Sequence, residues 1–280
     1  MAIEAGAQVS GLSGWINGSS AASSVIVTGT GSKWISRVDL VVGYTGAGKL
    51  TVSDGGQVLD SNVSYIGLGA ASSGTVDVVG AGSTYTSERE LLVGFSGTGA
   101  LGVEAGGQVI SGETRIGSGT GSSGTVAVTG NGSKWTNSGA IYVGYNGTGK
   151  LTVASGGRVL TQSLFASLAD LAGDGTIVAQ GAVLDGELEF APAGGSSLTF
   201  GNGGVLDLGL NGTGDIGAGY KTAGTLRVAG GRTVASANGF LGHSAGATGA
   251  ATVTGTGSQW TASQCLWVAH DGNGTLAVDA

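Results

Sequence analysis

Three carboxylates on one short stretch are the best candidates for chemistry in this chain. Asp185, Glu187 and Glu189 occupy every second position, and Leu188 and Phe190 lie between and after them. Successive side chains of a β-strand point to opposite faces, so we expect all three acids to leave one face while Leu188 and Phe190 enter the core. Carboxylates presented in this way can act as a general acid and base on a polysaccharide, or bind calcium.

A solvated acidic face is the alternative explanation of these carboxylates, and it is favoured. Residues 170–215 contain seven acidic residues and no Lys or Arg, which equals the formal net charge of −7 for the whole chain. The basic partners and aromatic subsites of a sugar-cleaving groove are therefore absent nearby. Local acidity also keeps rods from aggregating. The net negative charge, with no basic stripe, predicts that nucleic acid is not a partner.

The two histidines are the only side chains that could act as an imidazole base. His243 and His270 occupy matching places in adjacent repeat units, which predicts that their rings stack about 5 Å apart and resist double protonation. Two ligands make a poor metal site, so a stacked pair at a turn is expected. The serines lie in repeat corners, and no nucleophile elbow is present. We predict no catalytic residues, no metal site and no cofactor.

The aromatic residues form two sets that recur in every second repeat unit. One set follows a Gly-Ser-x corner (Trp34, Tyr85, Trp135 and Trp260), and the other follows a Val-Gly corner (Tyr44, Phe95 and Tyr145). Neighbours within a set should lie about 10 Å apart. We expect these rings to close the ends of the apolar core at corners. The alternative is a stripe that binds glycans or matrix proteins, with Trp34, Trp135, Trp260, Tyr44 and Tyr145 as candidate binding residues.

All these residues belong to a repeat. Four near-copies begin at Ser23, Gly74, Gly124 and Gly249, and a second family related to KLTVSDGGQV lies between them. Self-similarity at a fixed period predicts a solenoid, here with a unit of roughly 25 residues. The first apolar residues of the units are taken as Ile26, Leu50, Val76, Leu101, Val126, Leu151 and Ile177, and the period returns at Leu226, Ala251 and Leu276.

Short β-branched runs bounded by Gly, Ser, Asn and Asp predict strands of roughly three to five residues within each unit. Strands that recur in one order and direction bury their side chains by pairing in parallel with the copy one turn below, and the chirality of parallel crossovers makes the coil right-handed. The 60 glycines suit its corners, and the 40% hydrophobic content argues against disorder. The predicted fold is an all-β, right-handed parallel β-helix of about 10–12 turns.

The solenoid is predicted to have three parts. Residues 1–160 and 225–280 form regular turns, the latter truncated, and 161–224 form degenerate acidic turns. Within the degenerate part, Leu164, Leu168 and Leu171 have helical spacing, but the unchanged period favours an irregular turn over a short helix. Both ends of the sequence fall inside a repeat unit, and no apolar run of membrane-spanning length is present. We expect an uncapped fragment of a longer solenoid.

The phrase V-x-V-T-G-x-G-S-x-W alternates with L-x-V-G-Y-x-G-x-G-x-L-T-V-x-x-G-G-x-V over residues 1–160 and 225–280. This composite resembles the repeat of bacterial autotransporter (type V secretion) passenger regions. The resemblance implies an extracellular protein at the bacterial surface, associated with the outer membrane through a C-terminal barrel outside this chain. It also implies a stalk with an adhesive or self-associating surface that acts in adhesion, aggregation, biofilm formation or virulence, without catalysis.

The partners implied by the resemblance are host matrix or cell-surface molecules, or the same protein on neighbouring cells. Two alternatives remain open. One is a polysaccharide-acting β-helix enzyme that uses residues Asp185 to Glu189, and the other is an inert spacer. Fold alone does not decide between them.

Overall fold

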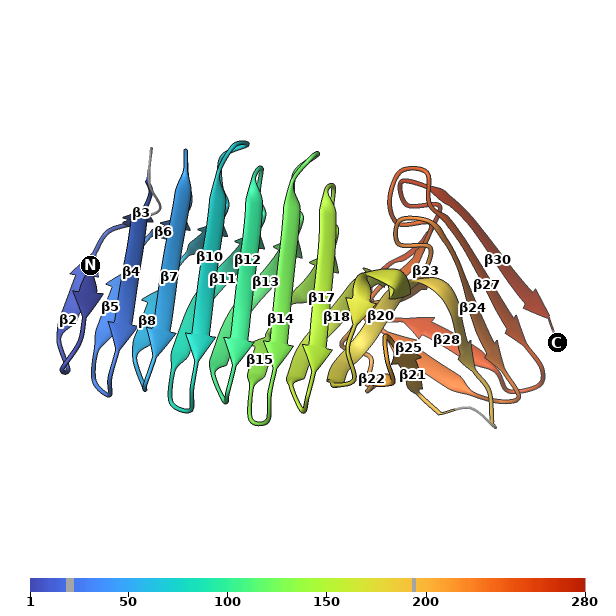
Figure 1. Cartoon of the computed structure of the whole chain (residues 1–280). Helices are drawn as coiled ribbons and strands as arrows, with labels where there is room; N and C mark the ends of the chain where they lie inside the picture. Colours follow the sequence, from blue (N-terminus) through green and yellow to red (C-terminus); the bar gives the residue numbers. More distant parts are fainter. Residues whose placement is uncertain (19–22, 193–194, 280) are drawn as a thin grey trace. The chain divides into compact units, whose positions relative to one another are not determined.

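The computed structural model confirms the predicted fold class. The chain is an all-β solenoid of parallel sheets, with about 11 turns of roughly 25 residues each (Figure 1). The structure describes residues 1–18, 23–192 and 195–279; positions 19–22, 193, 194 and 280 of the predicted parts lie outside these ranges. Within them, the only helix is the 3₁₀ helix η1 (Leu168–Asp170). Of the leucines with helical spacing, Leu168 begins this short helix, whereas Leu164 and Leu171 lie in strands.

Residue contacts divide the chain into two compact units. The first unit comprises Met1–Leu160 with Ala172–Thr176 and Asn202–Gly204, and the second comprises Thr161–Leu171, Ile177–Gly201 and Val205–Ala280.

The turns of the first unit have three faces. The first face contains the long arrows of Figure 1, which are β4 (Ser23–Thr28), β7 (Ala47–Ser53), β10 (Ser73–Val79), β12 (Thr98–Glu104), β14 (Ser123–Thr129) and β17 (Thr148–Ala154). The short strands β1 (Ala2–Ile3) and β19 (Leu171–Ala172) are the first and last strands of the same sheet. The second face contains β2 (Gln8–Gly11), β5 (Lys33–Ser36), β8 (Gln57–Asp60), β15 (Lys134–Asn137) and the start of β18 (Arg158–Ser167). The third contains β3 (Gly14–Ile16), β6 (Asp39–Val42), β9 (Val63–Ile66) and β16 (Ala140–Val143), while β11 (Thr84–Val93) and β13 (Gln108–Ile116) run through both the second and third faces.

The second unit also winds in parallel. Its strands are β20 (Thr176–Phe190), β21 (Ser197–Phe200), β22 (Gly204–Leu208), β23 (Ile216–Ala218), β24 (Ala223–Ala229), β25 (Thr233–Ser236), β26 (Gly239–Leu241), β27 (Thr248–Thr254), β28 (Gln259–Ala262), β29 (Leu266–Val268) and β30 (Asn273–Asp279). Three parallel stacks recur: β24–β27–β30, β25–β28 and β23–β26–β29.

The observed strand register corrects three details of the sequence-based expectation. Val25, not Ile26, pairs with Leu50, and accordingly Val25 is 7% exposed whereas Ile26 is 41% exposed. Ile177 lies in the long strand β20 rather than at the start of a regular unit. The first-face strands are longer than expected, since β7, β10, β12, β14 and β17 each have seven residues. They are longer because the flanking Gly and Ser residues join the ladder.

The core alternates between large and small side chains from one turn to the next. One column of paired positions on the second face contains Val9, Trp34, Val58, Tyr85, Val109, Trp135 and Val159. A neighbouring column on the third face contains Gly14, Leu40, Ser64, Leu91, Thr114 and Ile141. A turn with an aromatic ring and a Leu or Ile therefore follows a turn with Val and a small residue. This alternation explains why the most obvious similarity recurs every second unit.

Buried polar residues complete this packing. A third column contains Ser36, Asp60, Ser87, Ser111 and Asn137, all of them buried. The Trp135 indole Nε1 donates a hydrogen bond to Ser111 Oγ in the turn before it (2.9 Å). In the second unit, Trp260 Nε1 donates to Ser236 Oγ in the same manner (3.2 Å). The polar column thus satisfies N–H groups that the apolar core would leave without an acceptor.

Asp60 is the ionisable member of the polar column. It is fully buried, and its Oδ2 accepts a hydrogen bond from Ser64 Oγ (2.7 Å). Burial raises the Asp60 pKa to about 6, against the opposing effect of the Ser64 and backbone hydrogen bonds, and the Asp39 charge adds to the rise. Burial, followed by the Asp60 charge, also raises the Tyr85 pKa. At neutral pH, therefore, an ionised carboxylate sits in an unfavourable environment.

We predict that Asp60→Asn stabilises the first unit at neutral pH. The pKa of Asp60 is higher in the folded state than in the unfolded state, so the protonated side chain favours folding. This contribution to stability is fully present below about pH 4 and is lost as pH rises through about 6. The neutral isostere should raise the free energy of unfolding by about 2 kcal/mol at pH 8 and by almost nothing at pH 4. Urea unfolding at both pH values measures this difference. Glu88→Gln, at an exposed position of β11, is the control. An equal gain for Asp60→Asn at pH 4 would contradict the explanation.

Candidate functional site: an aromatic stripe on the first unit

The acidic strand keeps only part of its predicted arrangement. Glu187 and Glu189 are exposed while Leu188 and Phe190 are buried, as the alternation predicted. The prediction for Asp185 is wrong, because this residue is only 5% exposed and its Oδ1 accepts backbone N–H hydrogen bonds from residues 221 and 222 (2.9 Å each). The reason lies at position 186, where glycine adopts a φ of +109° and interrupts the extended strand.

The three acids consequently have three different environments. Asp185 is an acceptor for a buried turn, Glu189 forms an ion pair with Arg227 on β24, and Glu187 lies opposite Thr225. The structure does not bring them together as a convergent set of carboxylates. Among the described residues, no group of three or more His, Cys, Asp or Glu side chains is placed to hold a metal ion.

The tryptophans that follow Gly-Ser-x corners belong to the core. Trp34 is 6% exposed and Trp135 is fully buried, and Tyr85 of the same set is fully buried as well. Core closure, the first of the two interpretations, therefore describes them. Trp34 and Trp135 cannot form a binding stripe, because their rings lie over the small residues of the turn before. At Gly14, for example, an added Cβ would lie 2.5 Å from Trp34 Cζ2.

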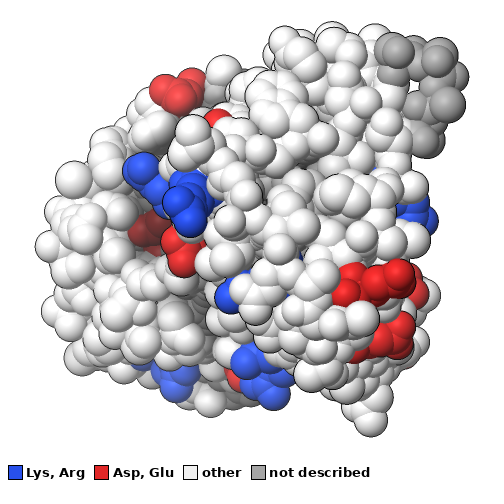
Figure 2. Space-filling model, turned by 90° about the vertical axis from the view of Figure 1, so that its left-hand side faces the viewer, with Lys and Arg blue, Asp and Glu red and all other residues white. Residues whose placement is uncertain are grey.

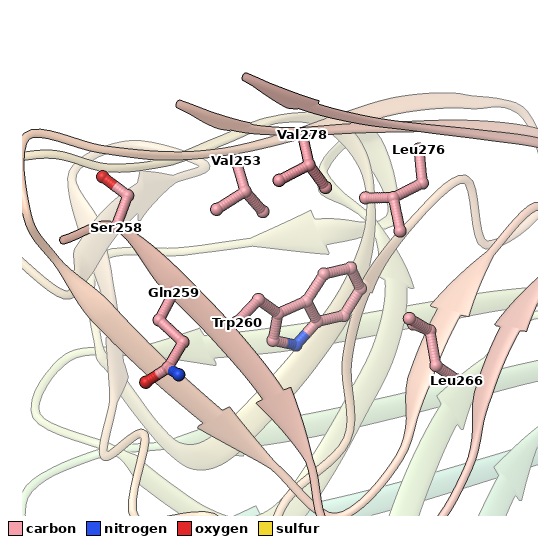
Figure 3. Close-up of a pocket in the computed structure, with 7 residues that line it drawn as sticks. All are labelled: Val253, Ser258, Gln259, Trp260, Leu266, Leu276 and Val278. Carbon is pink, nitrogen blue, oxygen red and sulfur yellow. The ribbon is translucent and has the colours of Figure 1, made fainter. Parts of the chain in front are cut away.

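Trp260 has the same inward orientation but is half-buried and lines a pocket of about 180 Å³. Figure 3 shows its indole facing Leu276 and Val278, with Leu266 beside it. The pocket lies between β27, β28, β29 and β30. In the described chain, β28, β29 and β30 are each the last strand of their stack. The pocket is therefore the interior of the last turn, continuous with the core.

The aromatic residues that follow Val-Gly corners lie on the surface instead. The corner glycines of the first unit are stacked turn upon turn with φ between 70° and 81°: Gly43, Gly67, Gly94, Gly117 and Gly144. An added Cβ at Gly94 would lie 2.2 Å from the Ser123 carbonyl oxygen, so only glycine fits. The chain turns sharply here and the next side chain lies outside the core. Tyr44 is 43% exposed, and Phe95 and Tyr145 are half-exposed.

A second outward column, which the sequence analysis missed, meets these corner rings. Paired positions on the third face place Trp15, Val41, Tyr65, Leu92, Arg115 and Tyr142 in one line. Edge-to-face ring pairs join the two sets: Trp15–Tyr44 (centroids 5.2 Å apart), Tyr65–Phe95 (5.5 Å) and Tyr142–Tyr145 (5.4 Å). The Arg115 guanidinium lies 5.0 Å from the centroid of the Tyr145 ring.

We call this surface the outer aromatic stripe and define it as Trp15, Tyr44, Tyr65, Phe95, Arg115, Tyr142 and Tyr145. Val41 and Leu92 point outward between its rings and yet are only 1% and 2% exposed, because the neighbouring side chains cover them. The missed signal was an aromatic residue or Arg two positions before a corner glycine, as in Tyr65-Ile-Gly, Arg115-Ile-Gly and Tyr142-Val-Gly.

Polar groups run beside the stripe. Asp39, Glu90 and Glu113 belong to the adjacent outward row of the same face. Arg115 pairs with Glu113 and lies 3.6 Å from Glu90, and Asn62 Nδ2 donates to Asp39 Oδ1 (3.0 Å). Burial raises the Tyr65 pKa, and the charges of Asp39 and Glu90 add to the rise. The stripe therefore combines ring surfaces with hydrogen-bonding groups of both signs.

The second unit carries a smaller cluster at the same kind of corner. Gly242 and Ala269 have φ of +68°, and His243 and His270 follow them. The two imidazoles are stacked, with centroids 5.1 Å apart and an angle of 11° between the rings, which confirms the predicted pair. Burial, followed by the His270 charge, lowers the His243 pKa to about 4, and Asp271 opposes this shift. Phe240 stacks on Trp267 beside them (4.8 Å).

Figure 2 shows small, separate groups of acidic and basic side chains on a largely uncharged face, and no broad basic patch is in view. In the part of the chain that the structure describes, no helix is both long and apolar enough to cross a membrane. Compared with protein-family models, curated proteins and solved structures, the chain gave no match to any of them.

We predict that acid destabilises the second unit through His243. Its folded pKa of about 4 lies below the ordinary value of 6.5, so the unfolded state binds more protons between these values. The stability that neutral His243 contributes is present above pH 6.5 and is lost as pH falls toward 4, by about 2 kcal/mol. Tryptophan fluorescence during urea unfolding at pH 7 and pH 4.5 measures the loss.

Two variants separate the causes of this pH dependence. His243→Tyr places at this corner the residue found at positions 44 and 145, and should remove most of the difference between the two pH values. His270→Gln removes only the second-largest cause of the pKa shift and should leave most of the difference in place. An unchanged pH dependence in His243→Tyr would show that another group titrates.

Proposed function

We propose that this chain is a non-catalytic binding segment of an extracellular bacterial passenger protein, acting as a stalk with an adhesive or self-associating side. The outer aromatic stripe is the observation that carries the proposal. It repeats along successive turns, so weak contacts can add along the solenoid.

The exposure of the stripe supports a binding role. Trp15 is 55% exposed and Tyr44 is 43% exposed, whereas Trp34, the inward ring in the turn of Tyr44, is only 6% exposed. Grouped exposed aromatic residues next to an Arg are typical of interaction surfaces. The rings are also held rigidly, because each lies on a strand or directly after a stacked glycine corner. Rigid presentation lowers the entropy that binding would otherwise cost.

The location and partners are proposed from the repeat. Its resemblance to autotransporter passenger regions supports display at the cell surface, in association with the outer membrane. Host matrix molecules, host cell-surface molecules or another copy of the protein are the proposed partners. A single cysteine is consistent with secretion as an unfolded chain, because no internal disulfide can form early and obstruct export.

Cell display tests the proposed function. The segment is presented on an otherwise non-adhesive bacterium, beside a spacer of equal length, and both cell settling and retention on matrix proteins and glycans are scored. We expect adhesion above the spacer, reduced several-fold by combined Trp15→Ala, Tyr44→Ala and Tyr142→Ala substitutions. Ile26→Ala and Ile110→Ala form the matched control, because these side chains are 41% and 45% exposed and lie away from the stripe. Adhesion no greater than that of the spacer would leave a structural stalk.

A further inference from the structure

We propose that the outer aromatic stripe binds a neutral, unbranched, β-linked polysaccharide whose chain lies along the stack of turns. This inference rests on the proposed binding function and specifies the ligand class of the same surface. It follows from three properties of the stripe: the spacing of its rings, the groups beside them and its width.

The spacing of the rings matches an extended sugar chain. Tyr44, Phe95 and Tyr145 follow the corners of every second turn, so with turns about 4.8 Å apart these rings recur at roughly 10 Å. A pyranose with its linkage oxygen takes up about half of that length in an extended chain. An extended β-linked chain also presents the same ring face to one side at every second sugar. Each corner ring can therefore meet an equivalent sugar face.

The chemistry of the stripe suits the two surfaces of a sugar. A pyranose has apolar C–H faces and hydroxyl groups around its edge. Ring surfaces on the stripe can pack against the C–H groups, while Asp39, Glu90 and Glu113 can accept hydrogen bonds from hydroxyls and Arg115 can donate them. Arg115 already contacts Glu113 and Glu90, and Asp39 accepts a hydrogen bond from Asn62, so the geometry of these groups is partly fixed before a ligand arrives.

The row of carboxylates favours a neutral ligand. Asp39, Glu90 and Glu113 line one side of the stripe, and the charges of Asp39 and Glu90 help to raise the Tyr65 pKa. A nucleic acid or an acidic glycan would be repelled along its whole length. The stripe is also narrow, since charged residues border the rings and Val41 and Leu92 are covered. Such a surface offers a thin chain continuous contact but gives a globular protein little apolar area.

Oligosaccharide titration of the purified 280-residue chain tests this proposal. The probes are cellohexaose and chitohexaose, which are extended, and maltohexaose, which has the same length but coils. We expect the two β-linked probes to change the fluorescence of Trp15 and to bind with little dependence on salt, and maltohexaose to bind at least tenfold more weakly. Trp15→Ala and Tyr44→Ala should each weaken binding about fivefold, measured by calorimetry, whereas Trp15→Tyr should restore most of it. Ile26→Ala should have no effect.

The outcomes separate this inference from the function on which it rests. Equal binding of maltohexaose, or unchanged affinity in both Trp15→Ala and Tyr44→Ala, overturns the proposed ligand class. A second outcome is that displayed cells adhere through the stripe, but the purified chain binds none of the three probes at millimolar concentration. This outcome overturns the proposed glycan ligand and supports the adhesive function. A mass increase in ultracentrifugation that Trp15→Ala abolishes identifies a second copy as the ligand and also overturns the proposal. Oligosaccharide binding without any adhesion of displayed cells supports the ligand and refutes the adhesive function.

Discussion

The distance of about 4.8 Å between successive turns is the constraint on which the rest of this structure depends. Every inward side chain has a neighbour at that distance above and below, so two indoles cannot occupy consecutive places in one column. The chain meets this limit by alternating bulky and slim turns: Trp135 and Ile141 follow Val109 and Thr114. The same spacing brings the Trp135 N–H within reach of Ser111. The distance between turns thus determines both the apolar packing and the buried hydrogen bonding of the core.

The stacking of turns also determines which side chains lie outside the core. The glycines stacked at each corner turn the chain sharply, so the side chain after each of them points to the surface. Tyr44 and Trp34 are ten residues apart and recur with the same period, yet one is 43% exposed and the other 6%. Their roles differ because of the backbone before them. The corner before Trp34 leads into a strand, whereas Tyr44 directly follows a glycine at φ of +81°.

Much of the fold was predictable from the sequence, because periodicity is a property of many residues together. The repeat gave the parallel pairing and the turn length, and the matching positions of His243 and His270 gave their stacking. Details that depend on one residue were less accessible. Ile26 and Val25 are both β-branched, and only the observed pairing shows which one faces inward. Asp185 was misplaced because the positive φ of Gly186 cancels the alternation that holds immediately after it. Only the corner rings of the stripe were recognised in the sequence. The outward column on the third face was missed because it combines aromatic residues with Val41, Leu92 and Arg115, and so has no simple composition.

The large–small alternation of the core also constrains how the gene for such a chain can change. Recombination between neighbouring copies adds or removes whole units. Gain or loss of a single unit would set two bulky turns, or two slim ones, against each other, giving either overlap or a void. Gain or loss of a pair leaves every contact as it was. Length variants of this solenoid that keep its packing should therefore differ by even numbers of turns, and the corner rings on its surface would keep their spacing at every permitted length.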